Sequence, residues 1–436
     1  MCIRDRNIAV KVKSRQADFS QFLLSAYLWQ RLTKTSGNDK KGETIVSRKV
    51  YLDNAATTYV STEVLNEMMP CFNVIYGNPS SIHGFGREAA AIVDRARDRV
   101  ANAINAKNSN EIYFTAGGSE ADNWAIKGLA HAYANKGKHI ITSAIEHHAI
   151  LDACAALEKE GFEVTYLPVD KYGLVSVAEL MHAIRKDTIL ISIMAVNNEV
   201  GTIQNIKTIA KTAHENGIIF HTDAVQAIGA VKIDVQDMEI DALSMSAHKI
   251  YGPKGAGALY LKNGIRIESL ISGGNQERGK RGGTLNVPAI AGFGKAIEIA
   301  VRDLTINQQK LRSIREYFLS KVKENIEYIH VNGHPHQKIQ GTVSISFEMV
   351  EGESILMLCD LEGVAVSTSS ACTSNSLQPS HVLKAMGIED EIAQGTIRFS
   401  FGKNISRAEV DYAVEVLTNA VKKLRAISPI TKAGRR

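Results

Sequence analysis

The sequence predicts an α/β protein in which a mainly parallel, seven-stranded sheet carries helices on both faces. Seven short apolar or β-branched runs occur from about residue 111 onward, and helix-like amphipathic stretches separate most of them. Such alternation is typical of a parallel sheet, because each connection between parallel strands crosses one face of the sheet. In chain order the runs are EIYFTA, HIITSAI, FEVTYLPV, TILISIMAV, GIIFHTDA, DALSMSA and GALYL.

A change of pattern near residue 300 predicts a second, smaller α+β unit. A long connecting helix comes first, because apolar residues recur there at helical spacing. These residues are Leu304, Leu311, Ile314, Phe318 and Val322. The runs GTVSISF, VAVST and GTIRFSFG then predict strands, and RAEVDYAVEVLTNAVKKLRAI predicts a final helix.

The length also favours two domains, since 436 residues exceed the roughly 250–300 at which a single hydrophobic core stops growing. We expect a large α/β domain over residues 59–303 and a small α+β domain formed by residues 49–58 together with residues 304–436. Residues 1–48 form a basic leader, which we expect to be disordered.

The net charge of +5 does not indicate a nucleic-acid partner, because the basic excess is confined to the start of the chain. Residues 1–49 hold 11 Lys and Arg against 4 Asp and Glu, so the remaining residues carry a net charge of −2. A disordered tail or a mis-assigned start codon explains this leader. An organellar transit peptide is the alternative, because such peptides are basic and poor in acidic residues.

The composition excludes a membrane protein and a disulfide-rich one. Hydrophobic residues make up 44% of the chain, and no apolar run approaches the roughly 20 residues of a membrane span. The 5 cysteines are scattered without a Cys-x-x-Cys pair, which argues against a disulfide framework and against an intrinsic metal site. A reducing compartment, the cytoplasm, is the simplest location.

A glycine turn offers a candidate phosphate site. Gly117, Gly118 and Ser119 follow the first predicted strand of the sheet and precede a helix, in FTAGGSEADNW. The start of a helix presents free backbone N–H groups, and Ser119 adds a hydroxyl donor. A plain helix cap is the alternative interpretation.

A carboxylate and a lysine follow two later strands. Asp223 ends the apolar run GIIFHTDA, with Gln226 close behind it. Lys249 follows DALSMSA, beside Ser246 and His248. Taken singly, Asp223 is equally well explained as a helix cap, and Lys249 is much better explained as a surface residue. A lysine, a carboxylate and a phosphate cradle together are what pyridoxal phosphate requires.

A histidine and a cysteine complete the candidate residues. His147, in TSAIEHHAILD, can stack on a cofactor ring and transfer protons near neutral pH, although a structural role is commoner. Cys372 lies in the polar stretch STSSACTSNSLQPSH, where a buried structural thiol is not expected. Cys154 and Cys359 lie in apolar helical contexts, so we expect them to pack in the core.

Together with YLDNAATT at residues 51–58 and GNPSSIHGFGREA at residues 77–89, these motifs resemble those of the cysteine desulfurases of the NifS and IscS type, which are class V aminotransferase-like enzymes. The resemblance extends from about Tyr51 to the C-terminal helices. It includes VNNEVGTIQ, SAHKIYGPKGAGALY, GGNQERGKRGGTLNVP, STSSACTSNSLQPSHVLKAMG and IRFSFG in the family's order. It implies a homodimeric pyridoxal phosphate enzyme of fold type I that acts on L-cysteine, with its active sites near the subunit interface.

The resemblance also implies roles for individual residues. Lys249 matches the lysine that binds the cofactor aldehyde, and His147 matches the histidine that stacks on the ring. Asp223 and Gln226 match the partners of the ring nitrogen and the ring hydroxyl. Cys372 matches the catalytic cysteine, whose thiolate takes the substrate sulfur as a persulfide.

The phosphate pocket and the substrate site are implied in the same way. Residues that match the phosphate pocket are Gly118, Ser119, Ser246 and His248. Thr284 matches a threonine that the other subunit donates to this pocket. Asn198 and Arg398 match groups that hold cofactor and substrate, and the planar guanidinium of Arg398 suits a carboxylate.

Two departures from the family pattern are small. The usual Arg-Ser-Gly-Thr is Arg281-Gly282-Gly283-Thr284 here, and Ser119 stands where threonine is commoner. The long polar stretch around Cys372 resembles the group that delivers sulfur to iron–sulfur scaffolds. Six extended residues on either side would allow travel of about 20 Å, and Cys372 can share a transferred iron–sulfur cluster.

Two other functions stay open on the sequence. The first is a different class V activity, such as a selenocysteine lyase or an aminotransferase. The second is a sulfur-carrier or scaffold-binding protein without turnover of its own. The identity of the protein that accepts the sulfur is not encoded in these motifs.

Overall fold

The structure is a computed structural model that describes residues 49–368 and 379–428. Within these residues, seven strands form one sheet in the order β2-β8-β7-β6-β5-β3-β4, and β8 alone runs antiparallel to its neighbours. The strands are β2 (Ile112–Thr115), β3 (His139–Ser143), β4 (Glu163–Leu167), β5 (Thr188–Ser192), β6 (Ile219–Asp223), β7 (Ala242–Ser246) and β8 (Gly257–Leu261). Each lies in one of the seven predicted runs, so the prediction of a mainly parallel seven-stranded sheet is confirmed.

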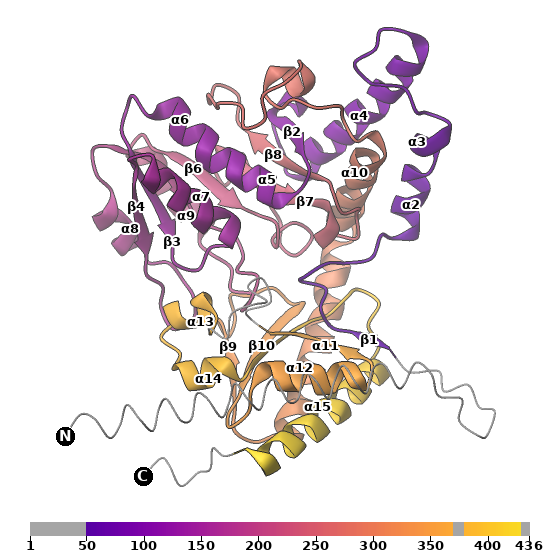
Figure 1. The fold of residues 1–436 in the computed structure, drawn as a ribbon, viewed down its shortest axis with the longest axis vertical. Coiled ribbons are helices and arrows are strands. Elements are labelled where there is room, and N and C mark those ends of the chain that lie inside the picture. Colours follow the sequence, from indigo (N-terminus) through magenta and orange to yellow (C-terminus); the bar gives the residue numbers. More distant parts are fainter. Residues whose placement is uncertain (1–48, 369–378, 429–436) are drawn as a thin grey trace.

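Helices cover both faces of this sheet (Figure 1). One face carries α5 (Gly118–Asn123), a π-helical turn (Trp124–Gly128), α6 (Leu129–Tyr133) and α7 (His148–Lys159). The other carries α4 (Gly84–Ala103), α9 (Ile206–Glu215) and α10 (Val287–Arg302). The strands are apolar on both sides, because alternate residues enter different cores: Tyr113 packs against Trp124, whereas Phe114 belongs to the core under α4 and α10.

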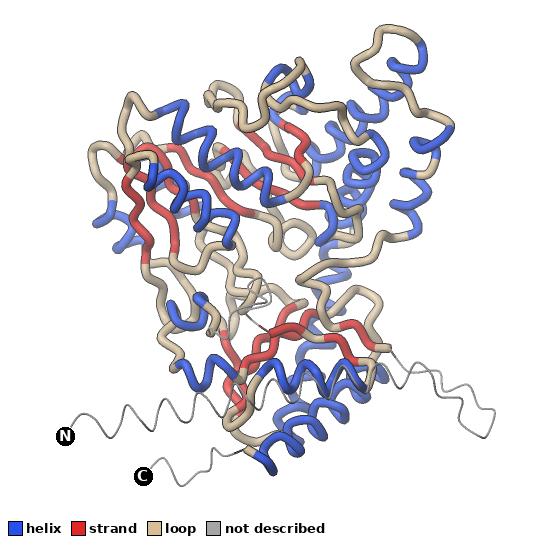
Figure 2. Tube along the Cα trace, in the orientation of Figure 1, coloured by secondary structure: helices blue, strands red, loops and turns tan. Residues whose placement is uncertain are grey.

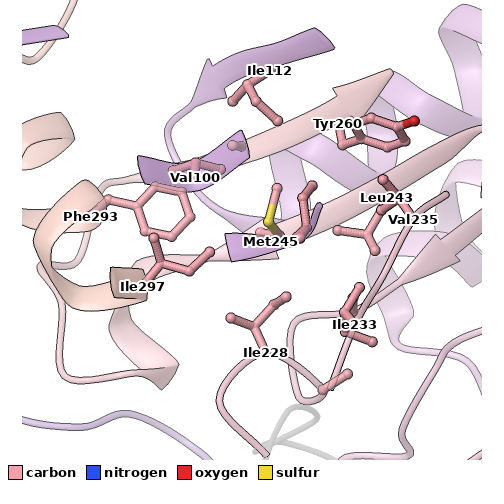
Figure 3. Close-up of a cluster of buried hydrophobic side chains, with 14 of the residues drawn as sticks. Val100, Ile112, Ile228, Ile233, Val235, Leu243, Met245, Tyr260, Phe293 and Ile297 are labelled. Carbon is pink, nitrogen blue, oxygen red and sulfur yellow. The ribbon is translucent and has the colours of Figure 1, made fainter. Parts of the chain in front are cut away.

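Figure 3 shows part of the core under α4 and α10. Val100 of α4 and Phe293 and Ile297 of α10 lie on one side of Met245 of β7, and Leu243 of the same strand lies on the other side, beside Val235. Shorter elements complete this part of the chain: α2 (Thr62–Met68), α3 (Pro70–Asn73) and α8 (Val177–Ala183), with 3₁₀ turns at Ser109–Glu111, Ala247–Lys249 and Gln276–Gly279.

The predicted connecting helix is α11 (Leu304–Asn325), and a second group of strands follows it (Figure 2). An antiparallel sheet has the order β12-β13-β10-β9, and β1 pairs with β11 in parallel. These strands are β1 (Val50–Tyr51), β9 (Ile329–Asn332), β10 (Thr342–Phe347), β11 (Val364–Ala365), β12 (Ser367–Thr368) and β13 (Thr396–Ser400). The helices are α12 (Gly352–Leu361), α13 (His381–Ala385), α14 (Asp390–Gln394) and α15 (Arg407–Ile427).

The first described residues pack with the end of the chain. Val50 and Leu52 belong to the same core as Phe318 of α11 and Leu417 of α15. Helix α15 begins in a capping box, in which Ser406 and Glu409 each bond to the other's backbone N–H. The domain boundaries at residues 59 and 303 stay a prediction. None of the helices in the described ranges is both long and apolar enough to cross a membrane.

A buried ion pair fixes the segment before α10 to the main sheet. Glu277 accepts two hydrogen bonds from Arg97 of α4, at 2.6 and 2.8 Å, and one from the backbone N–H of Phe114 at 2.7 Å. Glu277 and Arg278 both have positive φ, at 46° and 58°. Such backbone conformations are unfavourable for these residues and persist only where the surroundings hold them.

Glu277→Gln should therefore destabilise the protein strongly, because it leaves the buried charge of Arg97 without a counter-charge. We expect a loss of roughly 3–5 kcal/mol in the free energy of unfolding, measured by urea titration with fluorescence detection. Lys207→Met is the control, since Lys207 pairs with Asp237 at the exposed surface. An equally small effect of both substitutions would contradict a structural role for the Arg97–Glu277 pair.

Candidate functional site

The candidate site lies at the carboxyl ends of the parallel strands. Asp223 is the last residue of β6 and Ser246 the last of β7, and Lys249 ends the 3₁₀ turn that follows β7. Strands β6 and β7 are hydrogen-bonded neighbours, so these three predicted residues come from adjacent positions on one edge of the sheet. Ligands of open α/β sheets bind at this edge.

Lys249 is half-buried beneath a segment from the start of the described chain. Its ammonium donates to the carbonyl oxygens of Ala55 at 2.6 Å and Ala56 at 2.7 Å. The Gln226 side chain donates to the same Ala55 oxygen at 3.0 Å. The structure therefore brings the predicted residues Gln226 and Lys249 together at the Ala55 oxygen, a backbone partner that the sequence did not indicate.

Asp223 is buried, and burial raises the pKa of its carboxyl to about 6. The backbone N–H of Val225 donates to it at 2.8 Å, and this bond and the nearby charge of Lys249 limit the rise in pKa. A second buried carboxyl, Asp122 of α5, was not singled out by sequence reasoning. Burial, followed by the charge of Asp223, raises the pKa of Asp122 well above its usual value. Of the two carboxyls, Asp223 is therefore the more acidic.

Ser246 has the features expected of a phosphate ligand. Its hydroxyl is buried and has no hydrogen-bond partner among the described residues. Gly118, at the start of α5, packs beside it: a Cβ on Gly118 would lie 2.7 Å from Cγ2 of Val225 and 3.6 Å from Cβ of Ser246. The turn can therefore approach β7 closely only with glycine at this position.

The other predicted phosphate ligands differ in how far their side chains are buried. His248 is half-buried, with Nδ1 at 3.1 Å from the Thr57 hydroxyl, and burial lowers the pKa of its imidazole to about 4. Ser119 is exposed in the first turn of α5. Thr284 is exposed between the Gln276–Gly279 turn and α10, and none of the hydrogen bonds within residues 49–368 and 379–428 joins it to Ser246 or Lys249.

His147 forms the N-terminal cap of α7 and is half-buried. Its Nδ1 accepts a hydrogen bond from the backbone N–H of Ala149 at 3.1 Å. Burial lowers the pKa of the His147 imidazole, and the charge of Lys249 lowers it further. The neutral ring that results carries its hydrogen on Nε2.

Arg398 reaches the site from β13 of the antiparallel sheet and is buried. It donates to the backbone oxygen of Asn198 at 3.0 Å and to the Asp53 carboxylate at 3.0 Å. Its Nε–H is buried without a partner among the described residues. Sequence reasoning missed Asp53, although YLDNAATT contains it.

Cys372 lies outside the described residues, but the segments on either side of it are anchored near the other candidate residues. Ser367 of β12 pairs with Arg398, and the Ser380 hydroxyl donates to Glu199 at 2.5 Å. Burial raises the pKa of Glu199 to about 7. Cys154 and Cys359 are buried in the core, and burial raises the pKa of each thiol to about 12.

The influence of Lys249 on His147 can be measured. Lys249→Met removes a positive charge that disfavours the imidazolium, so the pKa of His147 in the cofactor-free protein should rise towards its ordinary value. Titration of the histidine ring signals by NMR gives this pKa. Lys254→Met, at an exposed lysine of the same loop, should leave the His147 pKa unchanged, and an equal rise in both variants would disprove the specific effect.

Comparison with known proteins places this site in a family. The aminotransferase class-V model matches residues 50–413. The proteins named cysteine desulfurase IscS from Methanosarcina thermophila and Dictyoglomus turgidum are 52% and 51% identical to this chain, over 88% of it and over 95% and 97% of their own lengths.

Solved structures agree. A NifS-like protein superposes with a TM-score of 0.82 at 38% identity, covering 86% of this chain and all of its own. A structure of SspA in complex with cysteine has a TM-score of 0.73 at 39% identity, over 81% of this chain and 99% of that one. The chain therefore belongs to the class-V aminotransferase family, whose members depend on pyridoxal phosphate.

Proposed function

We propose that this protein is a cysteine desulfurase, which removes sulfur from L-cysteine to give L-alanine and a persulfide on Cys372. One observation carries the proposal: Lys249, Asp223 and Ser246 meet at the ends of adjacent strands. The names of the relatives support the reaction, and the cysteine bound to SspA supports the substrate.

The described residues fit pyridoxal phosphate. When bound, this cofactor supplies an aldehyde that joins an amine and a ring that takes up electrons. Lys249 is the amine in our assignment, and Asp223 would bind the ring nitrogen. The buried hydroxyl of Ser246, which has no partner within the described ranges, would bind the phosphate. The further ligands proposed are Gly118, Ser119, Gln226, His248, Asn198 and, from a second copy, Thr284.

Asp223 suits this role because it can hold its negative charge. Its pKa of about 6 lies below neutral pH, whereas burial raises the pKa of neighbouring Glu146 to about 8. An ionised Asp223 keeps a facing nitrogen protonated. The half-buried Lys249 would take up and release a proton at Nζ, which the Ala55 and Ala56 oxygens hold in position.

His147 would manage protons near the substrate sulfur. Because Nδ1 accepts from Ala149, the neutral ring offers its N–H at Nε2. General acid–base catalysis of this kind typically contributes about 10²–10⁴ to a rate. His147 should therefore be important for the reaction without accounting for all of it.

Arg398 would bind the substrate carboxylate. Two of its nitrogens are held by Asn198 and Asp53, which fixes the plane of the guanidinium, and the buried Nε–H lacks a partner in the described part of the chain. A carboxylate oxygen would satisfy that donor with a charge-assisted hydrogen bond. Asn198 would contribute to substrate binding by holding the Arg398 guanidinium through its backbone oxygen.

Cys372 would take the sulfur and deliver it to an acceptor. The residues that flank its segment lie beside the site. Ser367 pairs with Arg398 between strands β12 and β13, and the Ser380 hydroxyl donates to Glu199. The acceptor in this proposal is an iron–sulfur scaffold or another sulfur-accepting protein, and an iron–sulfur cluster would be cargo. We place the protein in the cytoplasm, with an organelle as the alternative if residues 1–48 are a transit peptide.

We also propose a homodimer, supported by an apolar surface over α2, α3 and the start of α4. Phe72, Tyr76, Ile82 and Phe85 are all more than half exposed there. Exposed apolar patches of this kind mark interaction surfaces.

The test of the desulfurase proposal is incubation with L-cysteine. The Cys372 peptide should gain one sulfur by mass spectrometry, and alanine should form. In an assay with an added thiol reductant, which reduces the persulfide to free sulfide, Cys372→Ala should lose nearly all sulfide release, while the yellow colour of bound cofactor remains and borohydride still labels Lys249. Cys359→Ala, at a buried thiol, is the matched control and should keep activity. Full sulfide release by Cys372→Ala would overturn the proposal.

The dimer predicts a clear difference between two surface substitutions. Ile82 is 91% exposed in the single chain, so Ile82→Asp should be harmless in a monomer but should dissociate a dimer that buries it. Light scattering coupled to gel filtration measures the mass. Met181→Asp, at an exposed residue of α8, should leave a dimer intact. A monomeric wild-type protein, or no change of mass in Ile82→Asp, would exclude this interface.

A further inference from the structure

Two buried cations lie together outside the candidate active site, on α11 and on the segment between β9 and β10. Arg315 of α11 is 9% exposed, and Lys338 is 6% exposed. The segment that contains Lys338 packs on α11: a Cβ on Gly341 would lie 3.4 Å from Cδ1 of Leu311, one helical turn before Arg315.

Neither cation is neutralised within its surroundings. Over residues 49–368 and 379–428, no hydrogen bond or ion pair reaches the ammonium of Lys338, and Nε of Arg315 is buried without a partner. The one carboxylate within 4 Å of the Arg315 guanidinium in these ranges is Glu316, at 3.8 Å, and its side chain is 62% exposed. Buried charges are normally paired, so this arrangement needs an explanation.

The surrounding charges reinforce the positive potential. Burial, then the charges of Arg315 and Lys323, lower the pKa of Lys338 to about 8. Arg312 adds a further positive charge near Arg315. At neutral pH Lys338 is still mostly protonated, so two positive charges interact here on side chains that have little exposure.

A polar amide lies beside the pair. The Gln340 side chain donates from Nε2 to the Lys338 carbonyl oxygen at 3.2 Å, and its Oε1 is buried with no partner in the described part of the chain. Two neighbouring side chains, Arg315 and Gln340, therefore each hold a buried polar atom without a partner in the described ranges. Such a group is commonly completed by an ordered ion or water.

We propose that Lys338 and Arg315 form a binding site for a small dianionic oxyanion of the phosphate or sulfate type. A dianion matches two cations, and the guanidinium can bind two of its oxygens in parallel. The site would join α11 to a segment that is itself bonded to the larger unit, by Ile339 N–H to the Gly201 oxygen and Ile203 N–H to the Gln337 oxygen, both at 3.0 Å. Occupancy would thus strengthen a contact between the two units.

The test is calorimetric titration of inorganic phosphate into the full chain loaded with pyridoxal phosphate, in a chloride buffer of constant ionic strength. Cofactor loading keeps added phosphate from the active site. We expect saturable binding at one site per chain and a phosphate-dependent rise in the unfolding temperature. Sulfate should compete, and acetate at the same concentration should not.

Lys338→Met should weaken phosphate binding at least tenfold, and it should unfold no earlier than wild type in phosphate-free buffer, because it removes an unpaired buried charge. Lys323→Met is the control: it removes an exposed lysine of the same helix and should keep binding within about threefold. Arg315→Met is an independent variant, and it should also weaken phosphate binding at least tenfold. Absence of saturable binding, equal competition by acetate, or unchanged binding in both methionine variants of the pair would overturn the proposal.

Discussion

The site depends on one short segment, residues 53–58, which contacts residues at the ends of both main sheets. Its Ala55 and Ala56 oxygens accept from Lys249, which follows β7 of the seven-stranded sheet, and its Asp53 carboxylate accepts from Arg398 in β13 of the antiparallel sheet. Thr58 adds a bond to the His248 oxygen. A single stretch of backbone therefore sets the spacing between the residues assigned to cofactor and to substrate, without relying on the long connection through α11.

Burial also decides which carboxyls at this edge of the sheet carry a negative charge, because it raises their pKa values to different extents. The pKa is raised to about 8 for Glu146 and to about 7 for Glu199, and Asp122 is raised well above its usual range. Asp223 is also buried, but the backbone bond from Val225 and the charge of Lys249 restrain the rise in its pKa. Of these carboxyls it is the one best suited to stay ionised at neutral pH, as a partner for a protonated ring nitrogen must.

The main sheet, α11 and the second group of strands could be predicted from the sequence because their signals are local. The run TILIS, which is rich in β-branched residues, becomes the interior strand β5 and is buried at every residue, and α11 covers the five apolar positions that predicted it. The strand-end residues Asp223, Ser246 and Lys249 could also be predicted, since parallel topology brings the carboxyl ends of neighbouring strands to one edge.

The sequence by itself thus determined the order of elements, the edge that carries the chemistry and, through motif resemblance, the family. Only the tertiary structure decided which distant groups meet. The partners Asp53 and Arg398 lie 345 residues apart in the chain, and the two buried cations of Arg315 and Lys338 show no common motif. Such contacts are set by how units pack, and burial changes a pKa only once packing has removed the water. A local sequence pattern predicts neither these long-range contacts nor the pKa changes that burial causes.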